Sequence, residues 1–244
     1  MVPGFNEEMN RCRSMVTILA QTLARQGIGT LIIDLYGTGE SDGEYGDARW
    51  ETWIDDIHRA TEWLDAQTGG CLALLGIRLG FSLAVSAALA QQKSRALIAW
   101  QAVVDGKSYF TQFMRMKIAA NMDRTDIPKE TSGGMRAQLA AGSSIEIAGY
   151  EISPELGSAI DGMKLSELLP PEPSKVIWLE KSPGEEQALS PTSEKLIESW
   201  RQAGRVAEVM LYDGPAFWAL HERFLAPDLV SKTANWLKEF RPTI

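Results

Sequence analysis

Continuous apolar segments alternate with segments of helical periodicity along the first hundred residues of the chain. Apolar residues recur every three or four positions in an opening helix that ends at Gly27, and again over about 50–66. The continuous apolar segments are GTLIIDL (29–35), CLALLG (71–76) and ALIAWQAVV (96–104). Apolar strands separated by helices of ten or more residues indicate βαβ units and a parallel sheet covered on both faces. The sequence therefore predicts one buried strand for each of these segments.

The alternation breaks between residues 105 and 170. This region holds an amphipathic helix, a polar stretch near 123–134 and a hairpin around Ala148 and Gly149. We expect the polar stretch to be the most mobile part of the chain, because it offers little apolar area to offset the entropy of ordering.

The alternation returns with the strands SKVIWLE and AEVMLYD, each followed by a helix, at about 192–203 and 228–240. We expect an α/β fold with a doubly wound, mostly parallel sheet built from residues 1–104 and 171–244. Residues 105–170 are then a cap insertion. Such caps lie over the carboxyl ends of the strands, where ligands bind.

Composition and charge narrow the classes of function. The chain has 244 residues, of which 45% are hydrophobic, and a formal net charge of -8. The negative charge argues against nucleic acid and anionic membranes as partners. No apolar run reaches the roughly 18 to 20 residues of a membrane span, and no signal-peptide pattern opens the chain, so we expect a cytoplasmic protein.

The chain has few of the residues that form disulfides or bind zinc. The two cysteines, Cys12 and Cys71, lie far apart and are expected to be reduced packing residues. The two histidines, His58 and His221, form no cluster with them, so we expect no structural metal and no cofactor. His58 is expected to be structural or exposed to solvent.

The stretch LALLGIRLGFSLAVSAALA (72–90) carries the chemistry that most needs explaining. It is a buried strand, a turn bracketed by Gly76 and Gly80, and a helix. This is the geometry of a nucleophile elbow, in which a sharp turn lifts one side chain above the sheet. The residue at the apex is Arg78, which stays protonated and cannot attack a carbonyl carbon.

A cation at the amino terminus of a helix needs a partner, because the helix already carries partial positive charge there. Glu7 and Glu8 in the preceding loop, and Glu180 after a later strand, are the candidate carboxylates. A bound anion is the alternative, held by the guanidinium and the backbone N–H groups of Phe5 and Leu79.

A shifted register is a further alternative. GFSLA (80–84) is itself a Gly-x-Ser-x-Ala pattern with Ser82 as nucleophile, but this register would bury Arg78 inside the sheet at a cost of several kcal/mol. Ser41 is expected to hydrogen-bond its own turn.

The sequence resembles the α/β-hydrolase superfamily over nearly its whole length. The segment LIIDLYGTGESDG is similar to the strand-four turn of that superfamily, and LLGIRLG takes the place of its elbow. Four further segments resemble the exosortase A system-associated hydrolase 2 family of Gram-negative bacteria: PGFNEEMNRCR, DLYGTGESDGEYGDARWETW, LSP at 189–191 and GPAFW at 214–218. That resemblance implies a hydrolase and a gene neighbourhood of exopolysaccharide synthesis and protein sorting.

The chain departs from the superfamily pattern at its start. The superfamily has two or three strands before the loop that here begins at Pro3. We expect either a misplaced start codon or a truncated reading frame. One edge of the sheet would then be short and exposed.

The catalytic triad of the superfamily is also incomplete. Glu180 matches the position of the acid, with Glu185 and Glu186 as fallbacks, whereas Phe217 occupies the usual position of the histidine. His221 follows four residues later, either as a displaced base or as an ordinary helix-start or surface residue. Arg78, Glu180 and His221 are thus the positional candidates for catalysis.

Two functions stay open. In the first, the chain is a pseudoenzyme whose elbow binds an anionic or acyl ligand, or a protein partner of the exopolysaccharide system. In the second, it hydrolyses an ester or thioester with an unorthodox catalytic group. The expected lining of the ligand pocket is Phe5, Asn6, Glu7, Glu8, Leu79, Phe217 and Trp218.

Overall fold

Four parallel strands form the central sheet. The computed structural model describes residues 1–91, 95–124, 126, 128–182, 188–219 and 222–240. The strands are β1 (Ala73–Ile77), β2 (Ala96–Trp100), β5 (Lys175–Lys181) and β6 (Val206–Tyr212), in that spatial order. In register, Gly76 pairs with Ala99 and Trp178 pairs with Val209. The predicted α/β fold with a mostly parallel sheet is confirmed.

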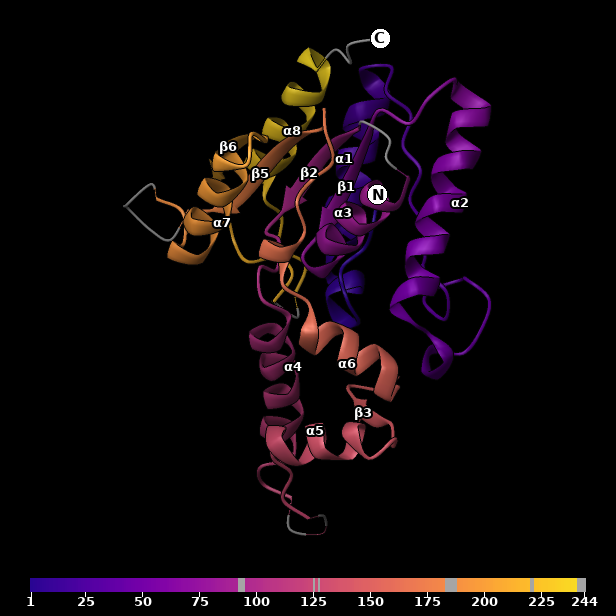
Figure 1. Cartoon of the computed structure of the whole chain (residues 1–244), viewed down its shortest axis with the longest axis vertical. Helices are drawn as coiled ribbons and strands as arrows, with labels where there is room; N and C mark the ends of the chain where they lie inside the picture. The colour runs from indigo at the N-terminus through magenta and orange to yellow at the C-terminus, as the bar shows by residue number, and fades with distance from the viewer. Residues whose placement is uncertain (92–94, 125, 127, 183–187, 220–221, 241–244) are drawn as a thin grey trace.

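Helices cover both faces of this sheet (Figure 1). One face carries α1 (Glu7–Arg25) and α8 (Pro227–Glu239). The other carries α2 (Trp50–Thr68), α3 (Leu79–Gln91) and α7 (Pro191–Gln202). The helix α3 is apolar and buried on nearly all sides, whereas the other four present an apolar face to the strands, so the sheet lies between two hydrophobic clusters. Within the described part of the chain, no helix is both long and apolar enough to cross a bilayer.

The strand expected at GTLIIDL is absent, and that prediction is wrong. Residues 28–35 form no helix or strand, and the side chain of Ile32 is 47% exposed. The preceding stub supplies one parallel bridge, from Val2 to Gly76, and the amino group of Met1 donates to Leu31 O at 2.6 Å. An apolar segment becomes a strand only beside a neighbour that pairs with it. Here the neighbour is one residue long, so the sheet edge at β1 is short, as expected.

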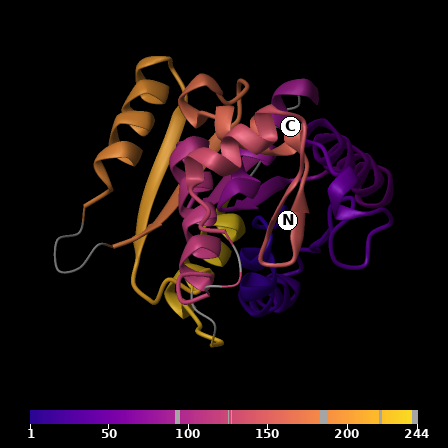
Figure 2. The same cartoon turned by 90° about the horizontal axis from the view of Figure 1, so that it is seen from below.

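Residues 106–167 form a separate group of elements below the sheet (Figure 1). The group contains α4 (Gly106–Ala120), α5 (Ser132–Ala140), β3 (Ile145–Ile147), β4 (Tyr150–Ile152), α6 (Pro154–Gly162) and the 3₁₀ helix η2 (Leu165–Glu167). A second 3₁₀ helix, η1 (Tyr45–Asp47), contacts β4. Figure 2, which looks from this end, shows these elements in front of the sheet.

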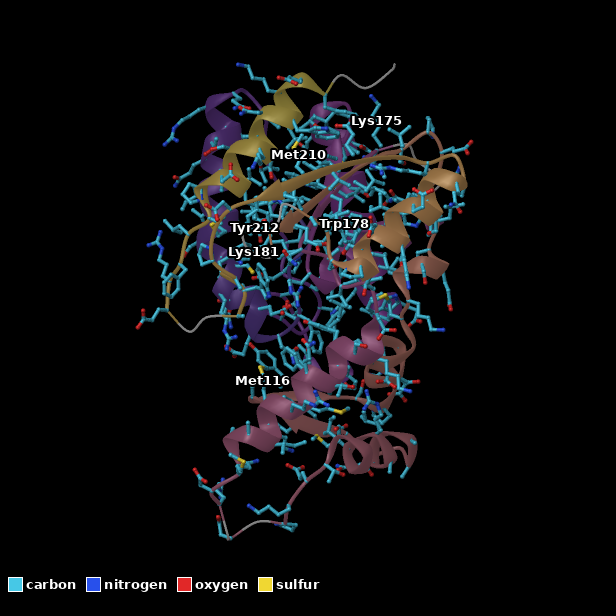
Figure 3. The ribbon with its side chains drawn as sticks, turned by 90° about the vertical axis from the view of Figure 1, so that its left-hand side faces the viewer. Met116, Lys175, Trp178, Lys181, Met210 and Tyr212 are labelled. Carbon is cyan, nitrogen blue, oxygen red and sulfur yellow. The ribbon has the colours of Figure 1, made fainter. Side chains whose placement is uncertain are left out.

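The group lies at the carboxyl ends of the strands. Figure 3 shows Lys181 and Tyr212 at the end of β5 and β6 that faces it, and Lys175 at the opposite end. The hairpin forms where the sequence predicted it, whereas α5 was missed. Paired glycines suggested a loop at its start, but the Thr131 hydroxyl accepts from Gly134 N at 3.0 Å and caps the helix. The polar stretch expected to be mobile includes residues 125 and 127, which lie outside the described residues.

Candidate functional site

The turn between β1 and α3 has the geometry of an elbow. Arg78 has a φ of 54°, in the left-handed region that L residues rarely adopt, and its N–H donates to Trp100 O at 2.9 Å. The helix begins at the next residue. Both bracketing glycines are required by close packing. A Cβ at Gly76 would lie 2.3 Å from Phe81 Cα, and a Cβ at Gly80 would lie 2.1 Å from Pro3 O.

With Arg78 at the turn between strand and helix, Ser82 is not at the position of a nucleophile. Ser82 lies inside α3 with no exposed surface, and its hydroxyl has no hydrogen-bond partner among the described residues. Ser41 donates to Asp34 O at 2.6 Å and stays within its own turn, as expected. His58 lies on α2, where its Nε2 contacts Ala87 O at 3.1 Å.

The partner of Arg78 is Glu8. Arg78 Nε donates to Glu8 Oε1 at 3.0 Å, and the two side chains are 14% and 9% exposed. Arg78 Nη1 donates to Gln101 O at 2.9 Å. The second oxygen of Glu8 accepts from the Tyr109 hydroxyl at 2.8 Å. An unpaired cation at the elbow was expected to be too costly, and the structure supplies a carboxylate.

Aromatic rings enclose the guanidinium. Its central carbon lies 5.1 Å from the Trp218 ring centroid and 5.6 Å from that of Tyr109. Both distances fall within the range of cation–π attraction. Among the described residues, no hydrogen-bond partner lies on Arg78 Nη2. One edge of the guanidinium therefore keeps donor capacity.

Burial and the carboxylate act on Arg78 in opposite directions. Burial is the largest single effect and lowers the pKa of Arg78. The charges of Glu8 and Tyr109 and the hydrogen bond to Glu8 raise it, and with a smaller effect of Cys12 they leave this pKa above its ordinary value. Burial, followed by the negative charge of Glu8, raises the pKa of the Tyr109 hydroxyl well above its usual value. Both shifts favour the charged form of Arg78 and the neutral form of Tyr109.

Strained backbone gathers around this pair. Asn6 and Gln101 also have positive φ values, of 49° and 48°. Asn6 comes shortly after the Val2 bridge, Arg78 directly follows β1, and Gln101 directly follows β2. These three strand segments are neighbours in the sheet. Each non-glycine residue in this region costs about 1 to 2 kcal/mol. Such strain persists only where the surrounding structure imposes it, and it concentrates at functional sites.

Glu180, the candidate acid, makes its hydrogen bonds away from Arg78. Glu180 is buried, and its two oxygens accept from Trp178 Nε1 and from Ser190 N, both at 2.8 Å. It therefore holds Ser190, the residue that caps α7, against β5. Glu185, Glu186 and His221 lie outside the described residues.

The expected pocket residues occupy different surroundings. Phe5 and Leu79 are buried, and Phe5 packs edge-on against Phe113. Phe217 packs against Trp100 on one side and against Trp218 on the other. The ring of Trp218 lies against Arg78.

Two more of these residues lie at the start of α1. Asn6 Oδ1 accepts from the Tyr45 hydroxyl, whereas Glu7 lies near Tyr150 and contributes, after burial, to a raised pKa of that hydroxyl. The hollow lined by Phe5, Asn6, Tyr45 and Leu79 holds about 10 Å³, room for at most about one water.

Sequence reasoning missed Tyr109 and Gln101. Gln101 directly follows β2, and its Oε1 accepts from Lys181 N at 2.7 Å, which ties the ends of β2 and β5 together. Its position at the carboxyl end of the strand beside β1 could have indicated it.

Residues 1–136, more than half of the chain, match a family model described as serine aminopeptidase, S33. The chain belongs to the serine aminopeptidase S33 family. This agrees with the predicted α/β-hydrolase superfamily. The narrower resemblance to the exosortase-associated family stays a prediction. No curated protein matches the chain.

Solved structures similar to this S33 protein include esterases and lipases. DcsB, solved with a substrate analogue, has a TM-score of 0.61 at 16% identity, covering 97% of this chain and 88% of its own. Est1E from Butyrivibrio proteoclasticus, solved with ferulic acid, has 0.59 at 13%, with 92% and 80% covered. A monoacylglycerol lipase from Paleococcus ferrophilus has 0.59 at 16%, with 92% and 89% covered. At these identities the likeness shows the fold alone.

Proposed function

We propose that this S33 protein is a pseudoenzyme that binds an anionic or acyl ligand at Arg78 and does not hydrolyse esters by a serine mechanism. One observation carries the proposal: a permanently charged guanidinium, paired with Glu8, occupies the apex at which a nucleophile would stand. A serine mechanism needs a hydroxyl there with a base in hydrogen-bond reach, and arginine can supply neither.

The unpartnered edge of Arg78 supports a ligand with a carboxylate or phosphate group. Nη2 can donate to such a group, and the adjacent amino terminus of α3 adds partial positive charge. The Trp218 ring beside the guanidinium offers an apolar surface to an acyl chain. A fatty acid anion combines both features.

Glu8 limits the affinity of this site. Its negative charge lies 3.0 Å from Arg78, so the pair presents little net charge to an incoming anion. Neutralising Glu8 should therefore strengthen anion binding, provided that the fold survives.

We also propose that the protein acts in the cytoplasm within an exosortase A and exopolysaccharide system. The motif resemblance described above supports this setting. Deleting the gene should reduce surface exopolysaccharide, and a plasmid copy with Arg78→Ser should fail to restore it.

Hydrolysis of an ester or thioester by an unorthodox group is the second candidate. Membership of the S33 family favours it. A fluorophosphonate probe separates the two functions, because it labels an activated serine. We expect no labelling of the wild-type protein and no turnover of short-chain nitrophenyl esters, and Arg78→Ser alone should restore neither. Labelling that Ser82→Ala or His221→Ala abolishes would support the enzyme and refute the pseudoenzyme.

A further inference from the structure

Gln101 contacts the Arg78 guanidinium through its main chain. The residue directly follows β2, and its carbonyl oxygen accepts from Arg78 Nη1 at 2.9 Å. Glu8 holds a second point of the same group, Nε, at 3.0 Å. A guanidinium is planar and rigid, so contacts at Nε and at Nη1 together fix the direction of Nη2. Nη2 is the nitrogen proposed above to donate to a ligand, so Gln101 lies in a position to aim it.

The main chain of Gln101 adopts an uncommon conformation at this contact. Its φ is 48°, in the left-handed region. This angle is the rotation about the N–Cα bond, so it sets where the carbonyl group lies once the N–H is held in place. The N–H of Gln101 is held, because it donates to Leu179 O of β5 at 2.9 Å. The left-handed φ therefore brings the carbonyl oxygen to Arg78.

The side chain of Gln101 provides a second anchor on β5. Its Oε1 accepts from Lys181 N at 2.7 Å, at the strand end that Figure 3 marks with Lys181. A strained backbone conformation persists only where the surrounding structure imposes it. The two hydrogen bonds to β5, one from the main chain and one from the side chain, hold the residue in its left-handed conformation.

We propose that Gln101 is a positioning residue of the Arg78 site. By anchoring to β5, its side-chain amide keeps its own carbonyl oxygen on Arg78 Nη1, and this contact presents Nη2 to the carboxylate of a ligand. The role rests on the proposed function, in which Arg78 binds an anion. A donor that is already oriented spares the ligand the cost of ordering it, so loss of the anchor weakens binding.

Two substitutions at residue 101 test this role, each by titration with octanoate and by a crystal structure. Gln101→Met keeps the length of the side chain, but a thioether is only a weak acceptor. Its φ should relax, its carbonyl should leave Arg78, and octanoate should bind at least fivefold more weakly than to the wild type. Gln101→Gly also lacks the anchor, yet glycine adopts a positive φ without steric cost. It should keep the carbonyl on Nη1 and bind octanoate within twofold of the wild type.

Gln138→Met is the matched control. The side chain of Gln138 also makes one hydrogen bond of 2.7 Å to the main chain, from Nε2 to Ser144 O, but it lies exposed on α5. This variant should change neither octanoate binding nor the contact between Arg78 and Gln101. If Gln101→Met does not fold, Gln101→Asn replaces it with the same expected loss, because its amide is one methylene too short to reach Lys181 N.

The glycine variant separates positioning from direct contact with the ligand. If Gln101→Gly weakens octanoate binding as much as Gln101→Met does, the carbonyl direction is not what matters and the positioning role is wrong. A Gln101→Met structure in which Arg78 Nη1 still donates to the carbonyl oxygen of residue 101 refutes it as well. A wild-type protein that does not bind octanoate overturns the proposed function alone, because the contact at Nη1 in these structures still decides whether Gln101 positions Arg78.

Discussion

The substitution Glu8→Gln should destabilise the fold strongly, because it leaves the buried charge of Arg78 without a counter-charge. The two charged groups are 3.0 Å apart, which corresponds to a gross attraction of about 5 kcal/mol at an effective dielectric constant of about 20. Removing one partner of a buried pair costs about 3 to 5 kcal/mol. Glutamine keeps the shape and one acceptor oxygen for Arg78, so we expect the lower end, about 3 kcal/mol.

Urea unfolding, followed by circular dichroism and tryptophan fluorescence, measures this loss. Glu167→Gln is the matched control, since its ion pair with Lys164 has the same 3.0 Å separation but lies in solvent, and its midpoint should not move. The double variant Glu8→Gln with Arg78→Met should recover most of the loss, because apolar residues can replace a buried pair at little cost. A Glu8→Gln protein as stable as the wild type would refute the burial argument.

Three further predictions concern stability. Burial lowers the pKa of the Met1 amino group from 8.0 to about 6, so the unfolded chain binds the extra proton between these values. The free energy of unfolding should therefore rise by up to about 2 to 3 kcal/mol from pH 6 to pH 8, and acetylating this amine should remove the slope; a slope that persists would contradict this. Ala148 has a φ of 53° in the β3–β4 turn, so Ala148→Gly should raise the melting temperature, with a gain of about 0.5 to 1 kcal/mol; an unchanged or lower value would argue against strain there. Gly80→Ala should cost about 2 to 3 kcal/mol by its clash with Pro3 O, whereas Gly133→Ala, with open space around it, should stabilise α5; equal effects in calorimetry would count against the close packing of the elbow.

The elbow could be predicted from the sequence because local rules define it. A buried strand, two glycines forced by backbone contact and a helix occur within one short stretch, and no distant residue is needed to place Arg78 at the apex. The choice of Glu8 over Glu7 could not be predicted in the same way. The two residues point about 100° apart on α1, so the choice depends on the residue at which the helix begins and on how it packs.

Features that depend on distant parts of the chain were harder to predict. Residues 29–35 have the composition of a buried strand, but a strand also needs a paired neighbour, which hydrophobicity does not reveal. Tyr109 reaches Glu8 from a helix a hundred residues away in sequence. Its role follows from how α4 packs beneath the sheet, which no local pattern specifies.

Isothermal titration with octanoate tests the central claim most directly, since this anion carries both a carboxylate and an acyl chain. Four proteins are compared: the wild type, Arg78→Gln, Glu8→Gln, and the double variant Arg78→Gln with Glu8→Gln. Circular dichroism confirms that each is folded. The account predicts that the wild type binds octanoate, that Glu8→Gln binds it more tightly, and that both proteins with Arg78→Gln bind at least tenfold more weakly than their arginine-containing counterparts. Equal binding with and without the Arg78 guanidinium would contradict it.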